Sequence, residues 1–591
     1  MKKWLAVVVT YWAMALARGS EAPPGVYVLP LDPQAKHRFF WTLDYVDSTI
    51  QIEVQASISS NKWFGIGFSD RGERSNADWC IFVSDKTGRA RILDAWTDDK
   101  CLLTIDQSQD CKGLRHTRTS SNTSRFSFYR KFDTCEPQDY VIERGTTHIV
   151  WTVGDGRIDG RNLCSLEGGF TRTEILKPPS QGFIPGEESW HLTVTAGGIS
   201  VPSVDTTYYC RVTKLPPQLS NRHHLVQICH LLFKINSNMS NWSYLHGVKS
   251  VPQLQFYRDV AGGSHALGRC EQKPKSVEAC KKVMAAWAMG ATPFSYPLEA
   301  GLPVGGSHYG SYAMLEVHYN NPEMRADWVD DSGLRVYLTK KLRPNDAAVI
   351  ELGLEYIDKM AIPPKQPNFQ LSASCLPQCT GVALPEGGIK VFASQLHTHL
   401  TGTRVETRHY RKGVELPLLN QDKHYSTHFQ EIRLLPQPVS VLPGDWLETK
   451  CWYDTTSREN ITLGGFAITD EMCVNYIYYY PSTELEVCKS SISDQPLADY
   501  FDTLHKFEDQ ATGSQLPISE SYYAIEWNPL RAEVLNKLYE EAPLYMQCNM
   551  SSGSRFPGDW TALHRPSITT PLPKEERQCG DFKEEKVNDL Y

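Results

Sequence analysis

Sixteen cysteines constrain the fold of this 591-residue chain more than any other feature of its sequence. They are spread along the chain and even in number, whereas the cysteines of a zinc knuckle would cluster at short spacing. Disulfides form and persist in oxidising compartments. The sequence therefore predicts a disulfide-bonded protein of the secretory pathway, which resides in the lumen of the endoplasmic reticulum, in a vesicle lumen or outside the cell.

The N-terminus favours the same compartment. Lys2 and Lys3 precede an apolar stretch at residues 5–17, and small residues follow it. This order predicts a signal peptide over residues 1–19. A membrane anchor is the alternative, but the apolar stretch is shorter than the roughly 20 residues that span a bilayer. We expect no transmembrane segment after the signal peptide, because no later apolar run reaches that length.

Charge excludes one class of function. The chain has 60 Lys and Arg against 68 Asp and Glu, which gives a formal charge of −8. A nucleic-acid-binding protein would normally carry a basic excess or a basic stripe. We therefore expect no nucleic-acid partner.

Several tripeptides match the acceptor pattern for N-glycosylation, in which Asn is followed two residues later by Ser or Thr. A secreted chain would carry glycans at such positions where they are exposed. The predicted sites are Asn122, Asn238, Asn241, Asn460 and Asn549.

The length predicts several domains, at roughly 100–200 residues each. Residues 25–155 contain short strand-like runs separated by turn residues, which predicts a β-sandwich with its last strand at residues 149–153. A segment rich in Pro, Gly and Ser at residues 178–186 predicts a linker. The other runs in this block are residues 39–43, 50–54, 63–68 and 81–83.

Two further strand-rich blocks follow, at residues 190–340 and 345–495. The first contains one predicted helix, which Ser276 would cap and in which Val283, Met284 and Trp287 would share a face. The strands expected in the two blocks lie at residues 315–319, 334–338, 349–354, 390–394, 446–452 and 474–480.

Residues 496–591 change in character. Leu497, Phe501 and Leu504 recur at helical spacing, and Asn528-Pro529 is typical of a helix start. The chain is thus predicted to be a mainly β, multi-domain protein with a short helical C-terminal region.

His397 and His399 form the sharpest candidate site. They follow a strand-like run, and residues i and i+2 of a strand face the same way. Two adjacent imidazoles could clamp a metal ion. The alternative is a pair of polar, outward-facing histidines, which the spacing alone makes equally acceptable.

Met472 and His318 extend this hypothesis. A thioether suits Cu(I), and imidazole suits both oxidation states of copper. His318 would share the polar face of a strand with Glu316. The alternatives are a methionine that fills a core and a histidine that is solvated or bonded within the core. Motifs of serine hydrolases, zinc peptidases and P-loop proteins are absent from the sequence.

Several segments resemble the copper type II, ascorbate-dependent monooxygenases. They are residues 206–210 (TTYYC), 396–402 (LHTHLTG), 424–431 (HYSTHFQE) and 471–476 (EMCVNY). Residues 63–68 (WFGIGF) and 76–78 (NAD) resemble a DOMON domain. A DOMON domain in front of two copper domains is typical of the dopamine β-hydroxylase branch of the family.

The resemblance implies four parts after the signal peptide. Residues 25–155 would be the DOMON β-sandwich, and residues 190–340 and 345–495 the two copper-domain β-sandwiches. Residues 496–591 would be a C-terminal region that is helical and tied by disulfides. The implied activity is the hydroxylation of a C–H bond in a small, amine-like substrate by O2, with copper as cofactor and ascorbate as electron donor. An oligomer is compatible with this organisation.

The resemblance also assigns site residues. His397, His399 and Met472 would bind the catalytic copper, called the M site, in the second copper domain. His318 would bind the electron-transfer copper, called the H site, in the first. Tyr208 and His397 would belong to the catalytic centre.

The H site is where this sequence departs from the family. The family has a His-His pair followed by Cys, but His223-His224 matches an earlier pair that does not bind metal. Either Cys229-His230 replaces the missing pair, or the segment is replaced and the H site is broken. A broken site would make the chain a secreted binding protein with impaired or no catalysis.

The resemblance finally implies disulfides. Cys280 would pair with Cys229, and four cysteines of the first block, Cys80, Cys101, Cys111 and Cys164, have no implied partner. The implied pairs are Cys135–Cys579, Cys210–Cys270, Cys375–Cys488, Cys379–Cys548 and Cys451–Cys473.

Overall fold

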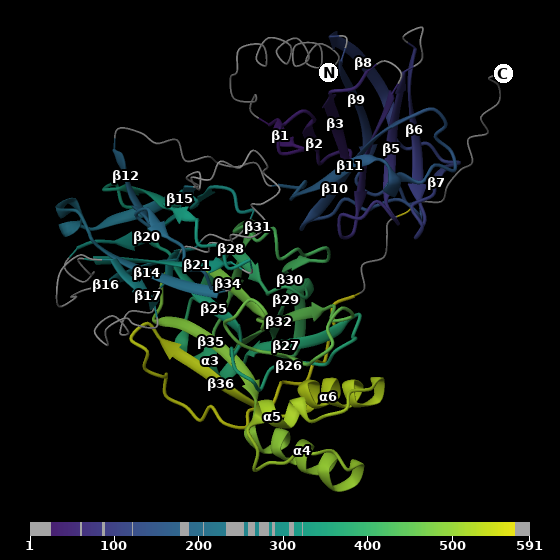
Figure 1. The fold of residues 1–591 in the computed structure, drawn as a ribbon. Coiled ribbons are helices and arrows are strands. Elements are labelled where there is room, and N and C mark those ends of the chain that lie inside the picture. The colour runs from purple at the N-terminus through teal and green to yellow at the C-terminus, as the bar shows by residue number, and fades with distance from the viewer. Residues whose placement is uncertain are drawn as a thin grey trace. The chain divides into compact units, whose positions relative to one another are not determined.

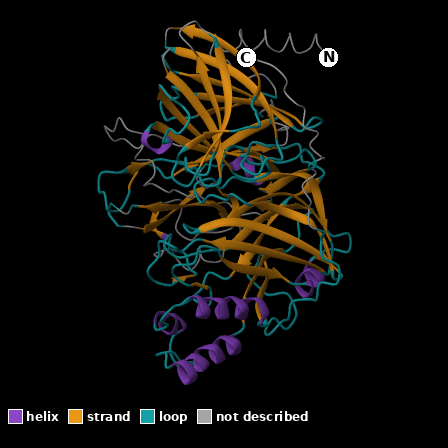
Figure 2. Ribbon diagram, turned by 90° about the vertical axis from the view of Figure 1, so that its right-hand side faces the viewer, coloured by secondary structure: helices purple, strands orange, loops and turns teal. Residues whose placement is uncertain are grey.

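The structure is a computed structural model with two compact units, residues 1–179 with 573–591 and residues 180–572 (Figure 1). Strands dominate both units, which confirms the predicted fold class (Figure 2). The structure describes residues 25–59, 62–84, 89–120, 122–177, 188–204, 206–231, 253–257, 266–270, 283–286, 290–306, 312–321, 323–573 and 579. The signal peptide, Asn238, Asn241 and Cys280 lie outside these ranges.

The first unit is a β-sandwich of two sheets. One sheet runs β1 (Tyr27–Pro30), β2 (Arg38–Asp44), β3 (Thr49–Ala56), β9 (Thr123–Lys131) and β8 (Lys112–Ser120). The other runs β11 (Glu167–Thr173), β10 (Thr147–Asp155), β4 (Lys62–Ser69), β5 (Asp78–Ser84), β6 (Ala90–Thr97) and β7 (Leu103–Ile105). A short 3₁₀ helix, η2 (Leu163–Ser165), precedes β11.

The core of this sandwich follows from strand alternation. Ile50, Ile52 and Val54 on β3 point inward and are fully buried, while the residues between them are more exposed. The prediction that residues 149–153 form the last strand is wrong, because β11 follows and pairs with β10 along its whole length. The sandwich therefore continues beyond residue 155.

The second unit begins with another sandwich. One sheet runs β12 (Ser189–Thr195), β23 (Gly333–Thr339), β15 (His223–Leu231), β20 (Ala300–Val304) and β24 (Asn345–Asp346), with β19 (Phe294–Ser295) beside β15. The other runs β17 (Ala266–Arg269), β14 (Thr206–Lys214), β21 (Tyr312–Asn320), β16 (Gln253–Tyr257) and β18 (Val283–Ala286). A two-stranded ribbon, β13 (Ile199–Ser200) with β22 (Val329–Asp330), and η3 (Pro217–Ser220) complete it.

A third sandwich follows in the same unit. Its larger sheet runs β31 (Arg433–Val441), β28 (Ile389–His397), β34 (Val474–Tyr480), β25 (Ala348–Leu354), β35 (Leu485–Ile492) and β36 (Leu544–Met550). Its smaller sheet runs β27 (Phe369–Cys375), β32 (Asp445–Tyr453), β29 (Gly402–Arg411) and β30 (Val414–Asp422). In the same part of the chain, β26 (Ala361–Ile362) and β33 (Thr462–Leu463) pair to form a separate two-stranded antiparallel ribbon.

The two sandwiches of this unit share one hydrophobic core. Phe294 and Tyr296 of the earlier sandwich pack against Phe392 and Tyr478 of the later one, with ring centroids 5.4 Å apart for Phe294–Tyr478 and 5.9 Å apart for Tyr296–Phe392. Because this contact is apolar and buried, it stabilises the association of the two sandwiches, but it lacks the directional preference of a hydrogen bond.

The described residues of the second unit form four α-helices, and α4, α5 and α6 gather at one end of it (Figures 1 and 2). Leu497, Phe501 and Leu504 are buried on α4, and the Asn528 side chain accepts from the Arg531 N–H to cap α6, so both helix predictions are confirmed. The chain then returns to the sheet as β36. The helices are α3 (Pro377–Ala383), α4 (Asp494–Glu508), α5 (Ile518–Tyr523) and α6 (Pro529–Glu541).

The helix predicted around residues 276–287 is wrong where the structure describes it. Val283–Ala286 form β18, which pairs with β16. Pairing with a strand distant in sequence outweighs the local helical spacing of the apolar residues. Residues 271–282 and 287 lie outside the described ranges.

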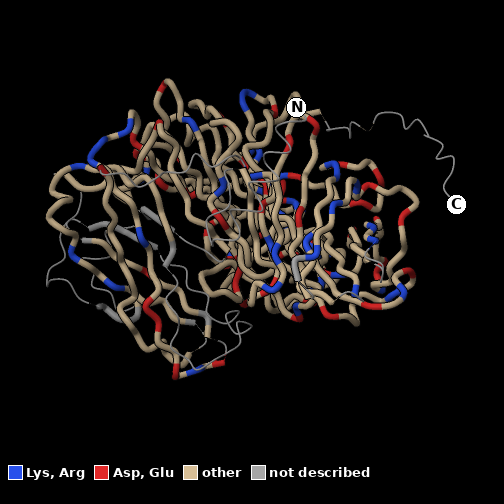
Figure 3. Tube along the Cα trace, turned by 90° about the horizontal axis from the view of Figure 1, so that it is seen from above, with Lys and Arg blue, Asp and Glu red and all other residues tan. Residues whose placement is uncertain are grey.

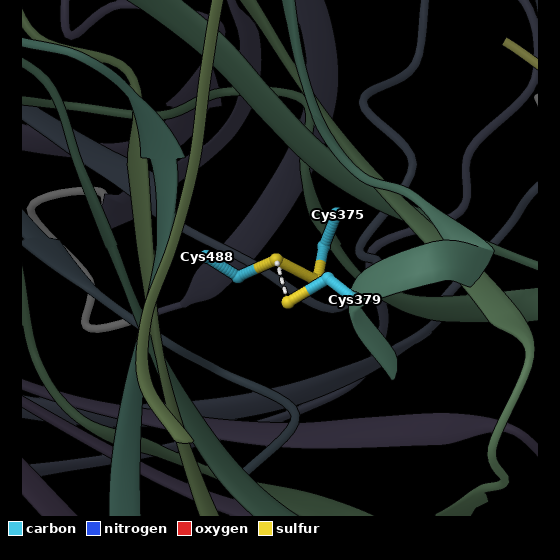
Figure 4. Close-up of side chains that lie close together, drawn as sticks. All are labelled: Cys375, Cys379 and Cys488. Atoms are coloured by element: carbon cyan, nitrogen blue, oxygen red, sulfur yellow. Dashed lines mark hydrogen bonds between the residues drawn. A yellow bond between two sulfur atoms is a disulfide. The ribbon is translucent and has the colours of Figure 1, made fainter. Parts of the chain in front are cut away.

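Seven disulfides link all of the described cysteines except Cys229. Five are the pairs that the family resemblance implies, and Cys80–Cys111 and Cys101–Cys164 are the other two. Cys375, Cys379 and Cys488 crowd together because two disulfides touch, with 3.4 Å between Cys379 Sγ and Cys488 Sγ (Figure 4). Their sulfurs are bonded, so this cluster cannot bind a metal as thiolates.

Charge and helix composition can be followed along the described residues. Basic and acidic residues are interspersed along the described trace (Figure 3). Of the helices in the described part of the chain, none combines the length and the apolar character needed to cross a bilayer.

Candidate metal centre

His397 and His399 lie where β28 ends. His397 is the last residue of this strand and pairs with Val474 at the start of β34. The two imidazole centroids are 5.3 Å apart, and their planes are nearly perpendicular at 88°. The prediction of adjacent imidazoles is confirmed. Strand alternation does not explain it, because β28 ends at His397 and His399 lies in the loop beyond the strand.

Hydrogen bonds define the tautomers of both histidines. His397 Nδ1 is 2.5 Å from Gln430 Oε1, and His399 Nδ1 is 3.0 Å from the Asp470 carbonyl oxygen. Both partners are acceptors, so each Nδ1 carries the proton and donates it. In neutral imidazole the lone pair that can bind a metal is then on Nε2, which is the usual arrangement of metal-ligating histidines.

Gln430 is itself held in one orientation. Its Nε2 donates to the Thr427 carbonyl at 2.7 Å, which leaves Oε1 directed at His397. The backbone carbonyl oxygen of Gln430 accepts from Gln395 Nε2 at 2.9 Å. The acceptor for His397 is therefore fixed by β28 and by the turn before residue 430.

Glu471 organises the loop that carries His399. Its carboxylate is fully buried and accepts from the backbone N–H groups of His399, Thr401 and Met472 at 2.9, 2.6 and 3.2 Å, and from the Thr401 hydroxyl at 2.7 Å. Burial raises the pKa of Glu471 to about 7, and these hydrogen bonds oppose that rise. Gly402 completes the loop, because a Cβ there would collide with Thr398 Oγ1.

Met472 is connected to His399 through Glu471, whose Oε2 accepts from the backbone N–H groups of both residues. It is 6% exposed, its carbonyl accepts from Tyr453 Oη at 2.8 Å, and Cys473 next to it is bonded to Cys451. Two imidazole nitrogens and a thioether form a donor set that suits copper. The chemistry of these residues therefore fits a copper ion.

His318 lies on β21 of the earlier sandwich. Leu315, Val317 and Tyr319 face the core, so His318 faces outward as predicted, and its 8% exposure reflects cover by Tyr208. The two rings stack with centroids 4.2 Å apart. Tyr208 Oη also donates to the Phe466 carbonyl of the later sandwich at 2.6 Å.

In the described part of the chain, Cys229 and His318 lie on different sheets of the earlier sandwich. Ile228 and Val336 are paired core residues, so Cys229 and its partner Arg335 face away from the core. His318 faces away from the same core on the opposite sheet. Cys229 forms no disulfide within the described ranges, and burial raises the pKa of its thiol. His230 follows it on β15, but its side chain lies outside the described part.

His223 and His224 form hydrogen bonds within the earlier sandwich and with the segment that follows it. The His224 Nδ1 accepts from the Arg343 N–H at 2.9 Å, so Nε2 carries the proton and donates to Asp346 Oδ1, also at 2.9 Å. His223 Nδ1 donates to the Asn221 carbonyl at 2.8 Å. With both nitrogens engaged, His224 is unsuitable as a metal ligand.

The predicted glycosylation sites differ in exposure. Asn122 and Asn460 are exposed, and Asn549 is half-buried on β36. A glycan needs an exposed amide nitrogen, so the first two sites are better suited to carry one.

Sequence reasoning missed the acceptors that orient the histidines. Gln430 and Asp470 are 33 and 71 residues from the imidazoles that they contact. Local spacing carries no information about such contacts. A strong signal existed only for Glu471, a carboxylate directly before a candidate ligand.

Three family models match the chain. Residues 34–154 match the DOMON domain, residues 192–326 the N-terminal domain of copper type II ascorbate-dependent monooxygenases, and residues 345–501 the C-terminal domain of the same family. Each match falls on a different one of the three sandwiches.

Curated relatives match over almost the full length. The chain is 39% identical to human dopamine beta-hydroxylase, over 97% of this chain and 93% of the relative. It is 36% identical to tyramine beta-hydroxylase of Caenorhabditis briggsae, over 87% and 86%. It is 28% identical to DBH-like monooxygenase protein 1 of Gallus gallus, over 98% and 94%.

Proposed function

The chain belongs to the copper type II, ascorbate-dependent monooxygenase family, and from this premise we propose that it hydroxylates a C–H bond of a small amine. One oxygen atom of O2 enters the substrate, and the other leaves as water. The two further electrons that this balance requires come from ascorbate. The relatives named for dopamine and tyramine support an amine as substrate.

His397, His399 and Met472 are the proposed ligands of the catalytic copper. Copper bound there would supply the one-electron redox chemistry that O2 requires. The observation that carries this proposal is the pair of Nδ1 hydrogen bonds, which places the proton of each ring on Nδ1 and leaves the Nε2 lone pair as the one able to bind a metal. Gln430 and Asp470 keep the two rings in place, and Glu471 holds the loop that bears His399 and Met472.

The proposed location is the secretory pathway. Seven disulfides in the described chain require an oxidising compartment to form. Two exposed sequons, Asn122 and Asn460, support passage through a glycosylating compartment.

The test is ascorbate-driven hydroxylation of tyramine by the purified, copper-loaded chain. We expect a hydroxylated product and an equal amount of ascorbate oxidised. A chain that consumes ascorbate without forming product, or that forms product without copper, would contradict the proposal.

A second candidate function is a secreted binding protein with slow or no turnover. Its support is the position of Cys229, on a different sheet from His318 and facing the other way. Among the described residues, His318 is the one predicted H-site ligand whose side chain is in place, and a site with that ligand alone would bind copper weakly. Copper stoichiometry separates the candidates, since two tightly bound ions per chain would favour the active enzyme and a single one at His397, His399 and Met472 would favour the impaired form.

A further inference from the structure

Both candidate ligand histidines are oriented by segments that the other copper sandwich contacts directly. Besides the shared apolar core, two hydrogen bonds between described residues connect the earlier sandwich, residues 190–340, to the later one. Each of these two points of contact lies within four residues of an acceptor for one imidazole. This pairing suggests a connection between domain contact and ligand geometry.

The first point concerns His397. Its acceptor, Gln430, is followed by Glu431, whose Oε2 accepts from Thr292 Oγ1 at 3.0 Å. Gly290 packs against Phe429 so closely that a Cβ there would lie 2.7 Å from the phenyl ring and 3.0 Å from the His428 carbonyl oxygen. Residues 290–292 of one sandwich therefore hold residues 428–431 of the other in place.

The second point concerns His399. Its acceptor is the carbonyl of Asp470, and the Asp470 carboxylate accepts from the Ala467 N–H at 3.0 Å. The Asp470 N–H in turn donates to the Ala467 carbonyl at 2.9 Å, so residues 467–470 form a short turn that directly follows Phe466. The Phe466 carbonyl accepts from Tyr208 Oη of the other sandwich at 2.6 Å. The turn thus connects a hydrogen bond across the interface to a hydrogen bond on the candidate ligand.

We propose that Thr292 and Asp470 are positioning residues that make the orientation of His397 and His399 depend on contact between the two copper sandwiches. This inference rests on the proposed function. The apolar contacts of Phe294 and Tyr296 hold the sandwiches together but are not directional. The two hydrogen bonds are directional, so they transmit position to the acceptor segments.

A consequence is that separation of the two sandwiches would release both acceptor segments together. Outer-shell partners of metal-ligating histidines typically contribute about 10–100-fold to metal affinity. Thr292 acts one residue beyond such a partner, so the lower part of that range is expected. The copper affinity of the M site would then fall about 10-fold when this contact is lost.

The test uses Thr292→Val, which keeps the shape of the side chain and removes the hydroxyl. Thr292→Ser restores the hydroxyl, and Thr193→Val makes the same change at an exposed position of the same sandwich. Two quantities are measured. Hydrogen exchange of peptides covering residues 426–431 is followed in the copper-free full-length chain, and Cu(I) affinity is measured by competition with a chromogenic chelator.

We expect Thr292→Val to exchange several-fold faster at residues 428–431 and to bind Cu(I) about 10-fold more weakly. Thr292→Ser and Thr193→Val should match the wild type. For the second point, Asp470→Ala should accelerate exchange at residues 465–472, and Asp470→Asn should restore it. Unchanged exchange and affinity in Thr292→Val would overturn the inference, whereas a wild-type chain that binds no copper would contradict the proposed function while the exchange result still tests the coupling.

Discussion

Met472 is the residue whose replacement separates copper binding from folding most cleanly. Its backbone groups are bonded to Glu471 and Tyr453, and these bonds do not involve the thioether. Met472→Ala should therefore leave the loop in place while it removes one ligand of three. We expect hydroxylation to fall by more than the roughly 10–100-fold that follows loss of an outer-shell partner. Ascorbate-dependent activity and secreted yield are the measurements.

A matched control is Met324→Ala, at a methionine that is 61% exposed. His397→Ala should behave like Met472→Ala, with His191→Ala at an exposed histidine as its control. Activity that survives the loss of Met472 would show that the assigned ligand set is wrong.

Asp94 should make the stability of the first unit depend on pH. It is 3% exposed on β6, and one of its carboxylate oxygens lies within 4.8 Å of a carboxylate oxygen of Asp78 and of Asp139. Burial and these two negative charges raise the pKa of Asp94 to about 8, while the backbone N–H of Asp110 and the nearby Arg130 oppose the rise. Burial also raises the pKa of Asp139 to about 6. The folded unit therefore holds protons that an unfolded chain, with pKa values near 4, would release.

The sign of the effect follows from linkage. Between about pH 4 and pH 8 the folded state binds more protons than the unfolded state, so stability is lost as pH rises. We expect the calorimetric transition of the first unit to move to lower temperature between pH 5 and pH 8. The shift should be about 2–4 °C for each kcal/mol lost in a domain of this size.

Asp94→Asn should flatten this dependence, because an amide does not titrate. The exposed Asp47→Asn is the control and should follow the wild type. A transition that rises with pH over this window would show that the carboxyl groups ionise normally in the folded unit.

At the scale of elements, the Cys451–Cys473 disulfide ties the segment of Met472 to β32. Its loop spans 22 residues, and removal of a native disulfide of this kind costs about 2–5 kcal/mol. A Cys451→Ser, Cys473→Ser double variant should lose stability and also bind copper more weakly. Denaturant unfolding and Cu(I) competition measure the two effects.

The comparison variant lacks Cys210–Cys270, in the other copper sandwich. It should lose a similar free energy of unfolding and keep the copper affinity at His397, His399 and Met472. Equal losses of copper affinity in both variants would mean that the disulfide stabilises the fold without positioning the ligand.

Strands were predictable from the sequence because their pattern is local. Alternation on β3 and the buried runs of β28 and β34 appear within single segments. The strand at Val283–Ala286 could not be predicted in this way. It pairs with β16, about 30 residues away, and this pairing outweighs the helical spacing of its apolar residues. The same limit applies to the site, where the ligands follow one another in short motifs but Gln430 and Asp470 arrive from distant loops.

At the scale of the whole molecule, the chain joins its two units twice. The first connection is the polypeptide near residue 180. The second runs from the C-terminal end of the second unit, where Thr569 N–H donates to the Gly413 carbonyl at 2.8 Å and Leu572 N–H donates to Glu415 at 3.0 Å. A few residues later Cys579 is bonded to Cys135 of the first unit. The disulfide thus closes a covalent ring across 444 residues.

This covalent ring makes a prediction that is independent of any enzymatic activity. A protease site placed between Pro179 and Ser180 should be cleavable without separating the chain, because Cys135–Cys579 still connects the fragments. A non-reducing gel should show one band near the intact mass, and a reducing gel should show two. Cys579→Ser should release the fragments without reductant, since it removes the second connection alone. Fragments that separate under non-reducing conditions in the unsubstituted chain would mean that Cys579 has another partner, and the C-terminal segment would then belong to the second unit alone.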